Sequence, residues 1–301
     1  MMARGSAAAE IVRLDTVDST QAVAGALAER GAADRTVVVA DQQLAGRGRR
    51  GRAWQAPAGT SLLASILVRP RLPQALLPTF SPTTAVATAE ALRRLAPVAA
   101  RVKWPNDVLI GGKKVAGILL ESRARSATWH PGSGVSEPGR SSLRPPSVHG
   151  GLPEPATIIQ GDLTDPATII PATTIPATTI IIGIGVNLGQ LDFPPELAGH
   201  ATSVALETGS APDRETMLAA LLEEFDAWRG RLEGEGFGPV RERWRMLSDT
   251  IGRHVTVDGL TGLAVDLDVD GALLIDVGGT VRRVIAGELA PDDAGSRAPN
   301  R

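Results

Sequence analysis

Four arginines and three glycines stand together at positions 46–52, in the segment Gly-Arg-Gly-Arg-Arg-Gly-Arg. The residues before this segment, Thr36–Gln43, begin with an apolar run and predict a buried strand that leads into it. Glycine lets the backbone turn tightly and approach a ligand. Arginine is a permanently charged fork that suits phosphate and carboxylate groups. The pattern indicates a loop that folds over an anion, with a solvated basic loop or a nucleic-acid-binding segment as the alternatives.

The composition narrows the class of protein. The 301 residues include 31 Lys and Arg against 33 Asp and Glu, so the net charge is −2 and argues only weakly for a nucleic-acid partner. The sequence has no cysteine, which excludes disulfides, thiolate metal ligands and cysteine nucleophiles. No apolar stretch reaches membrane-spanning length, and the N-terminus is too short and too weakly apolar for a signal peptide. We expect a cytoplasmic enzyme that contacts no membrane.

Periodicity and turn signals predict the elements that position the glycine–arginine loop. Asp18 and Ser19 have the residue types of a helix N-cap and precede an alanine-rich helix that Gly31 ends. A second helix is expected from Ser81 to about Leu95. The segments that read as strands, with a Gly-Gly hairpin signal at 111–112, are 10–17, 36–43, 61–68, 101–104, 108–110, 113–121 and 179–187.

The rest of the chain has two different characters. Residues 122–178 are rich in Pro, Gly, Ser and Thr and contain near-copies of the pentapeptides PATII and PATTI, which predicts a disordered insertion. Helices are expected over Arg214–Leu232, capped by Asp213, and over Pro239–Leu247. From Thr250 the apolar period becomes two, which favours a small antiparallel barrel. The expected domains are therefore 10–247 and 248–290.

Five short signals follow one another in a fixed order along the chain. They are Asp18-Ser19-Thr20, Gln43 with the glycine–arginine loop, Lys103–Asp107, Lys114–Ile118 and Gly183–Asn187. Each is weak alone, but together they resemble the biotin–protein ligases over about residues 10–121 and 179–290. The resemblance is to the monofunctional form without an N-terminal DNA-binding domain. It implies an α+β fold, with a mixed or antiparallel sheet and packing helices like the class II synthetases, followed by an SH3-like β-barrel.

The resemblance implies a two-step reaction that uses ATP. The carboxylate of biotin attacks the α-phosphate of ATP and gives biotinyl-5′-AMP and pyrophosphate. A lysine of a biotin carboxyl carrier protein, as in acetyl-CoA carboxylase, then takes the biotin and releases AMP. Charge gathers at the α-phosphate, where preorganised cations lower the barrier. Mg²⁺ is the expected cofactor, the carrier domain the expected partner, and the enzyme is expected to be a monomer or a weak homodimer that binds no nucleic acid.

Residue by residue, the resemblance assigns Lys114 and Arg49 to catalysis, with Lys114 between the biotin carboxylate and the α-phosphate. Gln21 stands where the family usually has Asn. Asn106 and Asp107 would also serve Mg²⁺. The residues expected to bind biotin are Ser19, Thr20, Gln21, Gln43, Arg47, Gly48, Arg49, Lys114 and Gly117. Those expected to bind ATP or the adenylate are Arg47, Arg49, Trp54, Asn106, Asp107 and Asn187.

The neighbouring residues have plainer expected roles. The loop is expected to act as a lid that becomes ordered over biotin and the adenylate. Arg50 and Arg52 receive no assigned role and are expected to be exposed or to serve the carrier protein. Lys113 is expected to be solvated, and Trp104 to be a packing residue.

Three other functions compete with this one. A lipoate–protein ligase shares the fold and the adenylate chemistry but is expected to have a different glycine-rich signature. A biotin-responsive DNA-binding repressor would need an N-terminal domain, for which the roughly seventeen residues before Asp18 are too few. An arginine–glycine RNA-binding module would need interleaved aromatic side chains, and the chain has no tyrosine.

Overall fold

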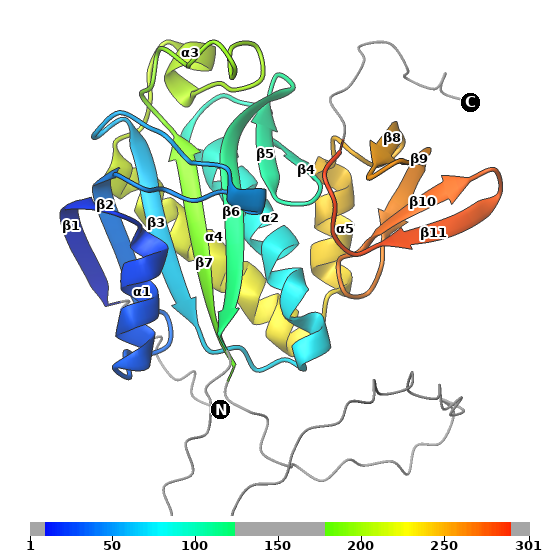
Figure 1. Cartoon of the computed structure of the whole chain (residues 1–301), viewed down its shortest axis with the longest axis horizontal. Coiled ribbons are helices and arrows are strands. Elements are labelled where there is room, and N and C mark those ends of the chain that lie inside the picture. Colours follow the sequence, from blue (N-terminus) through cyan, green and yellow to red (C-terminus); the bar gives the residue numbers. More distant parts are fainter. Residues whose placement is uncertain (1–9, 124–177, 290–301) are drawn as a thin grey trace, which may run out of the picture.

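The computed structural model describes residues 10–123 and 178–289, and a seven-stranded sheet lies at its centre (Figure 1). The strands are β1 (Ile11–Val17), β2 (Val37–Gln43), β3 (Ser61–Val68), β4 (Arg101–Lys103), β5 (Asp107–Ile110), β6 (Lys113–Arg123) and β7 (Thr179–Asn187). Their order across the sheet is β1-β2-β3-β7-β6-β5-β4. The β1–β2 pair is parallel, and all other neighbours are antiparallel. The expected α+β fold with a mixed sheet is confirmed.

Helices cover both faces of this sheet (Figure 1). Helix α1 (Thr20–Glu29) packs on β2, β3 and β7, whereas α2 (Phe80–Leu95) and α4 (Arg214–Glu235) pack on each other and on the opposite face. Helix α5 (Gly238–Leu247) follows α4. Three short helices were not expected from the sequence: η1 (Arg49–Gly51), η2 (Gln74–Thr79) and α3 (Val204–Thr208). No helix among the described residues is long and apolar enough to cross a membrane.

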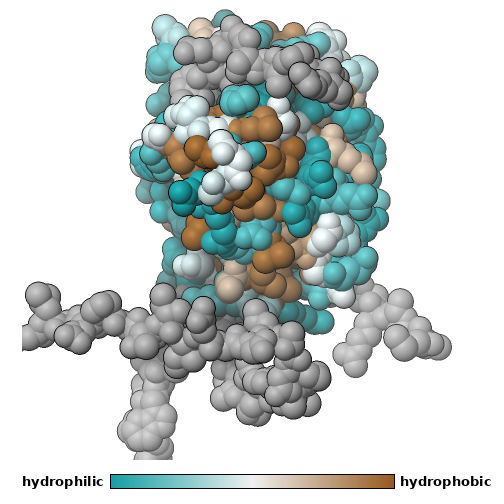
Figure 2. Space-filling model, turned by 90° about the vertical axis from the view of Figure 1, so that its right-hand side faces the viewer, coloured by the Kyte–Doolittle hydropathy of each residue, from teal (hydrophilic) through white to brown (hydrophobic). Residues whose placement is uncertain are grey.

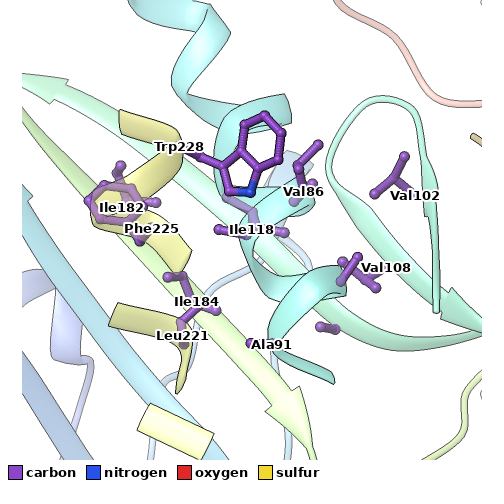
Figure 3. Packing of buried hydrophobic residues seen from close by; sticks show 14 of the residues in the cluster. Val86, Ala91, Val102, Val108, Ile118, Ile182, Ile184, Leu221, Phe225 and Trp228 are labelled. Carbon is purple, nitrogen blue, oxygen red and sulfur yellow. The ribbon is translucent and has the colours of Figure 1, made fainter. Parts of the chain in front are cut away.

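The main hydrophobic core fills the space between the sheet and the α2–α4 pair (Figure 3). Strand residues such as Ile118 and Ile182 meet Val86 of α2 and Phe225 of α4, and all four are buried. The face predicted for α4 is confirmed, since each of its members is buried: Met217, Leu218, Leu221, Leu222, Phe225 and Trp228. A smaller apolar cluster lies under α1.

The strands on either side of the predicted insertion are paired to their ends. Ser122 and Arg123 still belong to β6, where they pair with Ile180 and Thr179 of β7. The predicted start of the insertion at 122 is therefore wrong by two residues, because antiparallel pairing continues that far. Residues 124–177 of the expected disordered segment lie outside the described residues. Strand β7 is in regular register with both of its neighbours, β3 and β6.

A second sheet follows α5 and contains β8 (His254–Val257), β9 (Leu260–Leu267), β10 (Leu273–Val277) and β11 (Thr280–Val284). It is antiparallel with the order β11-β10-β9-β8. Within the described ranges β8 and β11 do not pair with each other, so the sheet is open and closure into the expected barrel is not seen. Its buried residues join the main core. Whether 248–290 is a separate domain stays a prediction.

Trp104 connects the two sheets. Its side chain is buried, its backbone N–H donates to Thr250 Oγ1 at 3.0 Å, and its indole N–H donates to the carbonyl of Gly271 at 3.3 Å. The expectation that Trp104 is a packing residue is confirmed. The contact fixes the C-terminal sheet against the end of β4, close to the start of β5.

The outer side of the C-terminal sheet mixes apolar and charged side chains, and hydrophobic patches lie among hydrophilic ones on this side of the molecule (Figure 2). Val269, Val281 and Ile285 are all more than half exposed. The edge strand β11 also carries Arg283, which pairs with Asp268 at 2.6 Å. Charged side chains on an edge strand discourage pairing with another chain. The charges thus protect this apolar edge.

Candidate active site

A polar cluster lies where α1 begins. The backbone N–H of Thr20 donates to Gln43 Oε1 at 2.8 Å, and the Thr20 hydroxyl lies 3.1 Å from the same oxygen. The same hydroxyl lies 2.8 Å from Ser65 Oγ of β3. The structure therefore brings together two expected biotin-binding residues, Thr20 and Gln43, and adds Ser65. Within the buried strand 61–68, sequence reasoning did not single out Ser65.

Ser19 and Gln21 flank Thr20 and are also buried. Ser19 occupies the N-cap position of α1, as predicted, but its side chain makes no capping hydrogen bond. Gln21 Nε2 donates to the carbonyl of Leu119 at 3.1 Å, and its side chain lies across Gly183 of β7. A Cβ on Gly183 would be 2.6 Å from Gln21 Cδ, so a larger residue there would displace the Gln21 side chain.

The glycine–arginine loop is a narrow hairpin. The Gly48 N–H donates to the carbonyl of Arg52 at 2.7 Å, and the Trp54 N–H donates to the carbonyl of Gly46 at 2.9 Å. A Cβ on Gly46 would be 2.5 Å from the Trp54 carbonyl oxygen, which explains the glycine there. The loop crosses the face of the sheet in front of β6 (Figure 1). It therefore lies on the same side of the sheet as α1.

The indole of Trp54 rests on strand glycines. A Cβ on Gly185 of β7 would collide with this ring, and one on Gly117 of β6 would be 3.0 Å from Trp54 Cζ3. Trp54 Nε1 is buried without a hydrogen-bond partner among the described residues. Paired in register, Gly117 and Gly185 form a floor without side chains. A flat aromatic ring over such a floor is suited to stacking on another planar group.

Lys114 and Gly117 share one face because of an irregularity in β6. The pairing of β5 with β6 shifts between Val108 and Leu109, so that the partners change from Ala116 to Lys114. Val115 is the extra residue of this bulge, and Val115 and Ala116 are both buried in the main core. Strict alternation would separate positions 114 and 117, but a bulge re-aims side chains. A Cβ on Gly117 would be 3.0 Å from Lys114 Cε.

A cluster of cations and oxygen ligands lies beside the glycine floor. Lys114 Nζ is 2.6 Å from Asp107 Oδ1 and 5.7 Å from the centroid of the Trp54 ring. Arg49 Nη1 donates to Asn106 Oδ1 at 3.3 Å, while Asn106 Nδ2 donates to the carbonyl of Ile118 at 2.6 Å. The loop and the β5–β6 hairpin thus place both expected catalytic cations next to the expected Mg²⁺ ligands. Sequence reasoning placed these residues together by resemblance, not by spacing.

Burial changes the electrostatics of Arg49. Desolvation, followed by the charge of Arg50, lowers the pKa of Arg49 from its ordinary value, whereas Asp107 and Glu288 act in the opposite direction. An arginine remains charged at neutral pH even so. A partly desolvated guanidinium interacts more strongly with an anion than one in bulk water does. Arg49 is therefore suited to stabilise charge in the site.

Arg47 pairs with a residue that sequence reasoning missed. Its Nη2 lies 3.1 Å from Glu121 Oε1, and Glu121 stands on β6 beyond Leu119. The expected end of this strand included Glu121, but no sequence signal indicated its partner. Lys113, by contrast, is exposed and lies 3.9 Å from Glu207, which agrees with its expected solvated position.

Asn187 is tied to the protein on both sides. Asn187 Nδ2 donates to the carbonyl of Thr202 at 3.0 Å, and Ser61 Oγ lies 3.5 Å from Asn187 Oδ1. Thr202 donates its own N–H to the carbonyl of Lys114 at 2.8 Å. These contacts favour a role in positioning the segment beside Lys114. Direct contact of Asn187 with the adenylate stays a prediction.

These features define a class of site. Cations, a planar stacking surface and a buried polar cluster lie on one face of a sheet and under one arginine-rich loop. Such a site can bring a carboxylate and a nucleotide phosphate together, and it needs no histidine or cysteine nucleophile. The geometry is that of an acyl-adenylate-forming site.

Comparison with known proteins gives the family. Residues 14–136 match the biotin/lipoate A/B protein ligase family. The chain is 33% identical to the biotin–[acetyl-CoA-carboxylase] ligase of Paracoccus denitrificans over 271 residues, which cover 87% of this chain and 92% of the relative. It is 29% identical to the bifunctional ligase/repressor BirA of Bacillus subtilis, over 91% of this chain and 72% of the relative. The chain therefore belongs to the biotin–protein ligase family.

A solved structure supports the same assignment. The biotin protein ligase from Aquifex aeolicus in complex with biotin and ATP is similar, with a TM-score of 0.68 and 25% identity. The match covers 93% of this chain and 97% of that protein. The fold described above, including the C-terminal sheet, is therefore a fold of this family.

Proposed function

We propose that the chain is an ATP-dependent biotin–protein ligase, which converts biotin to biotinyl-5′-AMP and then transfers biotin to a lysine of a carrier protein. The observation that carries the proposal is that Lys114 and Trp54 lie over the glycine floor while Arg49 contacts Asn106 beside it. The named relatives, which are biotin ligases, support it. They favour biotin over lipoate.

Two cations act in the first step. The biotin carboxylate attacks the α-phosphorus, its P–O bond forms, and the bond to the pyrophosphate oxygen breaks. Lys114 bridges the carboxylate and the α-phosphate, and Arg49 takes the charge that develops on the phosphate oxygens. Both are held in place by protein oxygens at Asp107 and Asn106. Preorganised cations of this kind lower a barrier because they need little reorganisation during the reaction.

The polar cluster at the start of α1 holds the ureido ring of biotin. A ureido group has two N–H donors and one carbonyl acceptor, and the cluster offers hydroxyls and amides of both kinds. Ser19, Thr20, Gln21 and Gln43 supply these groups. Arg47, Gly48 and Gly117 contact biotin from the loop and the floor. Gly48 lets the ligand approach the loop backbone, and Gly117 leaves room for the Trp54 ring and Lys114 that border the ligand.

ATP occupies the side of the floor at Trp54, Asn106 and Asp107. Asn106 and Asp107 also fit Mg²⁺, because their amide and carboxylate oxygens lie close together and each already faces a cationic side chain. The described part of the chain has no cluster of three or more His, Cys, Asp or Glu side chains that could hold a metal alone. Mg²⁺ at nucleotide sites takes one or two carboxylates plus phosphates and waters. Asp107 and Asn106 would hold an ion of this kind, which would screen the phosphate charge.

The second step needs a protein partner. The amine of a carrier lysine attacks the acyl carbon of the adenylate, the C–O bond to the phosphate breaks, and AMP leaves. A biotin carboxyl carrier domain of an acyl-CoA carboxylase fits this step, in keeping with the name of the Paracoccus relative. We propose that the enzyme acts in the cytoplasm as a monomer or weak homodimer and binds no nucleic acid.

Pyrophosphate release tests the first step. The chain with ATP and Mg²⁺ should release pyrophosphate when biotin is added and not without it. With a carrier domain added, labelled biotin should reach the carrier lysine, and lipoate should not. Lipoylation without biotinylation would overturn the assignment of the substrate. If a folded chain released no pyrophosphate in response to biotin, the assignment as a ligase would be wrong.

A further inference from the structure

The arginines of the loop divide between two sets of partners. Arg47 and Arg49 contact residues of the large sheet, as described above. Arg50 Nη2 donates to Asp258 Oδ1 at 3.0 Å and Oδ2 at 3.1 Å. Arg52 forms an ion pair with Glu288. Arg50 and Arg52, which received no role from the sequence, therefore contact the C-terminal sheet.

The two acids belong to one small structure. Asp258 lies in the turn between β8 and β9, and Leu289 forms an isolated bridge with Val257. Gly287 makes the close packing possible, since a Cβ there would collide with Val257 and would be 3.1 Å from Asp258 Oδ2. The β8–β9 turn and the segment after β11 thus place Asp258 and Glu288 side by side. Arg50 Nη1 is 3.9 Å from Glu288 Oε2, so the two acids share Arg50.

Both ends of the Arg50–Asp258 pair have unusual backbone conformations. Arg50 has φ of 55° and Asp258 has φ of 47°. Positive φ is disfavoured for residues other than glycine, and such conformations persist only where the surrounding structure holds them. Arg49 and Arg50 are neighbours in sequence but contact different parts of the protein, Asn106 and Asp258. The left-handed conformation of Arg50 stands at the point where the loop divides between these two partners.

We propose that Asp258 and Glu288 are positioning residues for the ligase reaction, because by binding Arg50 and Arg52 they hold the arginine loop with Arg49 facing Asn106. The proposal rests on the proposed function, and it gives the C-terminal sheet a part in the first step. The acids touch neither biotin nor ATP. They act through the loop.

The size of the expected effect follows from exposure. The side chains of Arg50 and Asp258 are 50% and 53% exposed, and that of Glu288 is 38% exposed. Exposed ion pairs add little stability individually, and salt screens them. Removing both acidic charges should therefore raise the rate of hydrogen exchange in the loop about three- to tenfold and leave the fold intact. High salt should reduce the difference between the variant and the unaltered chain.

The test uses isosteric variants in the full chain. Asp258→Asn with Glu288→Gln should speed hydrogen exchange of the hydrogen-bonded Gly48 and Trp54 amides about three- to tenfold, without any substrate. It should lower kcat/KM for biotin-dependent pyrophosphate release by a similar factor. Asp268→Asn is the matched control, since that acid pairs with Arg283 within the same sheet and should change neither measurement.

A charge exchange gives a second arm. Arg50→Asp and Asp258→Arg should each lower kcat/KM, and the double variant should recover most of the loss. If the double amide variant keeps both exchange and kcat/KM within twofold of the unaltered chain, the proposal is wrong. Faster exchange with an unchanged kcat/KM also overturns it, because the loop would then be held without consequence for the reaction.

The design separates this proposal from the ligase itself. If the unaltered chain released no pyrophosphate with biotin, the proposed function would fail and the part of Asp258 and Glu288 in catalysis would fail with it. Hydrogen exchange would still decide whether these acids hold the loop. If the unaltered chain is active and the double amide variant matches it in both measurements, only the positioning proposal fails.

Discussion

Lys114 Nζ lies 2.6 Å from Asp107 Oδ1, across the hairpin formed by β5 and β6. The ammonium group is thus held at the edge of the glycine floor by the carboxylate that we propose as a Mg²⁺ ligand. A lysine that is fixed by one partner loses less conformational entropy when it binds substrate. The pair makes position 114 the most direct place to test the chemistry.

Replacing Lys114 by alanine should reduce biotin-dependent pyrophosphate release by at least about a hundredfold, as expected for the loss of one preorganised group in a transition state. The fold should survive, because the side chain is about a third exposed. Circular dichroism and a melting curve check the fold. Lys113→Ala is the control, and it should keep full activity. A folded Lys114→Ala chain with normal activity would remove Lys114 from the mechanism.

Replacing Asp107 by asparagine should raise the Mg²⁺ concentration needed for half-maximal pyrophosphate release. The change keeps the shape of the side chain but removes the charge that faces Lys114 and a metal ion. A Mg²⁺ titration at saturating ATP and biotin measures it. Asp41→Asn is a suitable control, since Asp41 pairs with Arg214 outside the site. An unchanged Mg²⁺ requirement would contradict the assignment of Asp107.

Replacing Gly185 by alanine should weaken ATP binding more than it weakens the fold. The new methyl group would collide with the indole of Trp54 and push the ring off the floor. We expect KM for ATP to rise about tenfold or more, the size of effect typical when a close-packed group is displaced in a site. Gly230→Ala in α4 meets no atom within 4 Å and should leave KM unchanged. Equal effects of both changes would refute the stacking role of Trp54.

Replacing residues 124–178 by an Asn-Gly turn should leave activity largely unchanged. Arg123 and Thr179 are already paired, so a two-residue turn can join β6 to β7 there. Comparing kcat/KM for biotin in the shortened and full chains is the measurement. A shortened chain that keeps its melting transition but loses pyrophosphate release would show that the removed residues contribute to catalysis.

Much of the fold could be predicted because its strands and helices carry strong local signals. The apolar run 179–187, the face of α4 and the glycine hairpin at 111–112 all confirm such signals. The boundary at Ser122 was missed because pairing with β7, not local composition, extends β6. The barrel was expected from the number and spacing of short strands. Spacing does not determine whether the first and last strands meet, and here they do not.

The site was harder to predict, because its residues are brought together by strand pairing and long-range contacts and not by local sequence signals. Residue types and order indicated the arginine loop and Lys114, but alternation along a strand would separate Lys114 from Gly117. The bulge at Val115 brings them together, and nothing in the local sequence announces it. Asp258 and Glu288 lie more than 200 positions from Arg50, so only the folded chain reveals their contacts. Long-range partners of charged residues have no sequence period to follow.

Each arginine of the loop already has an oxygen partner within the protein: Glu121, Asn106, Asp258 or Glu288. A substrate anion that binds Arg47 or Arg49 would therefore exchange partners with Glu121 or Asn106 and would not neutralise a free charge. The net gain on ground-state binding is then a small difference between two similar contacts. An anion gains binding free energy only if it has more charge or better geometry than the protein's own oxygens. The transition state at the α-phosphate is such an anion. We therefore expect the loop to favour turnover over tight retention of its substrates.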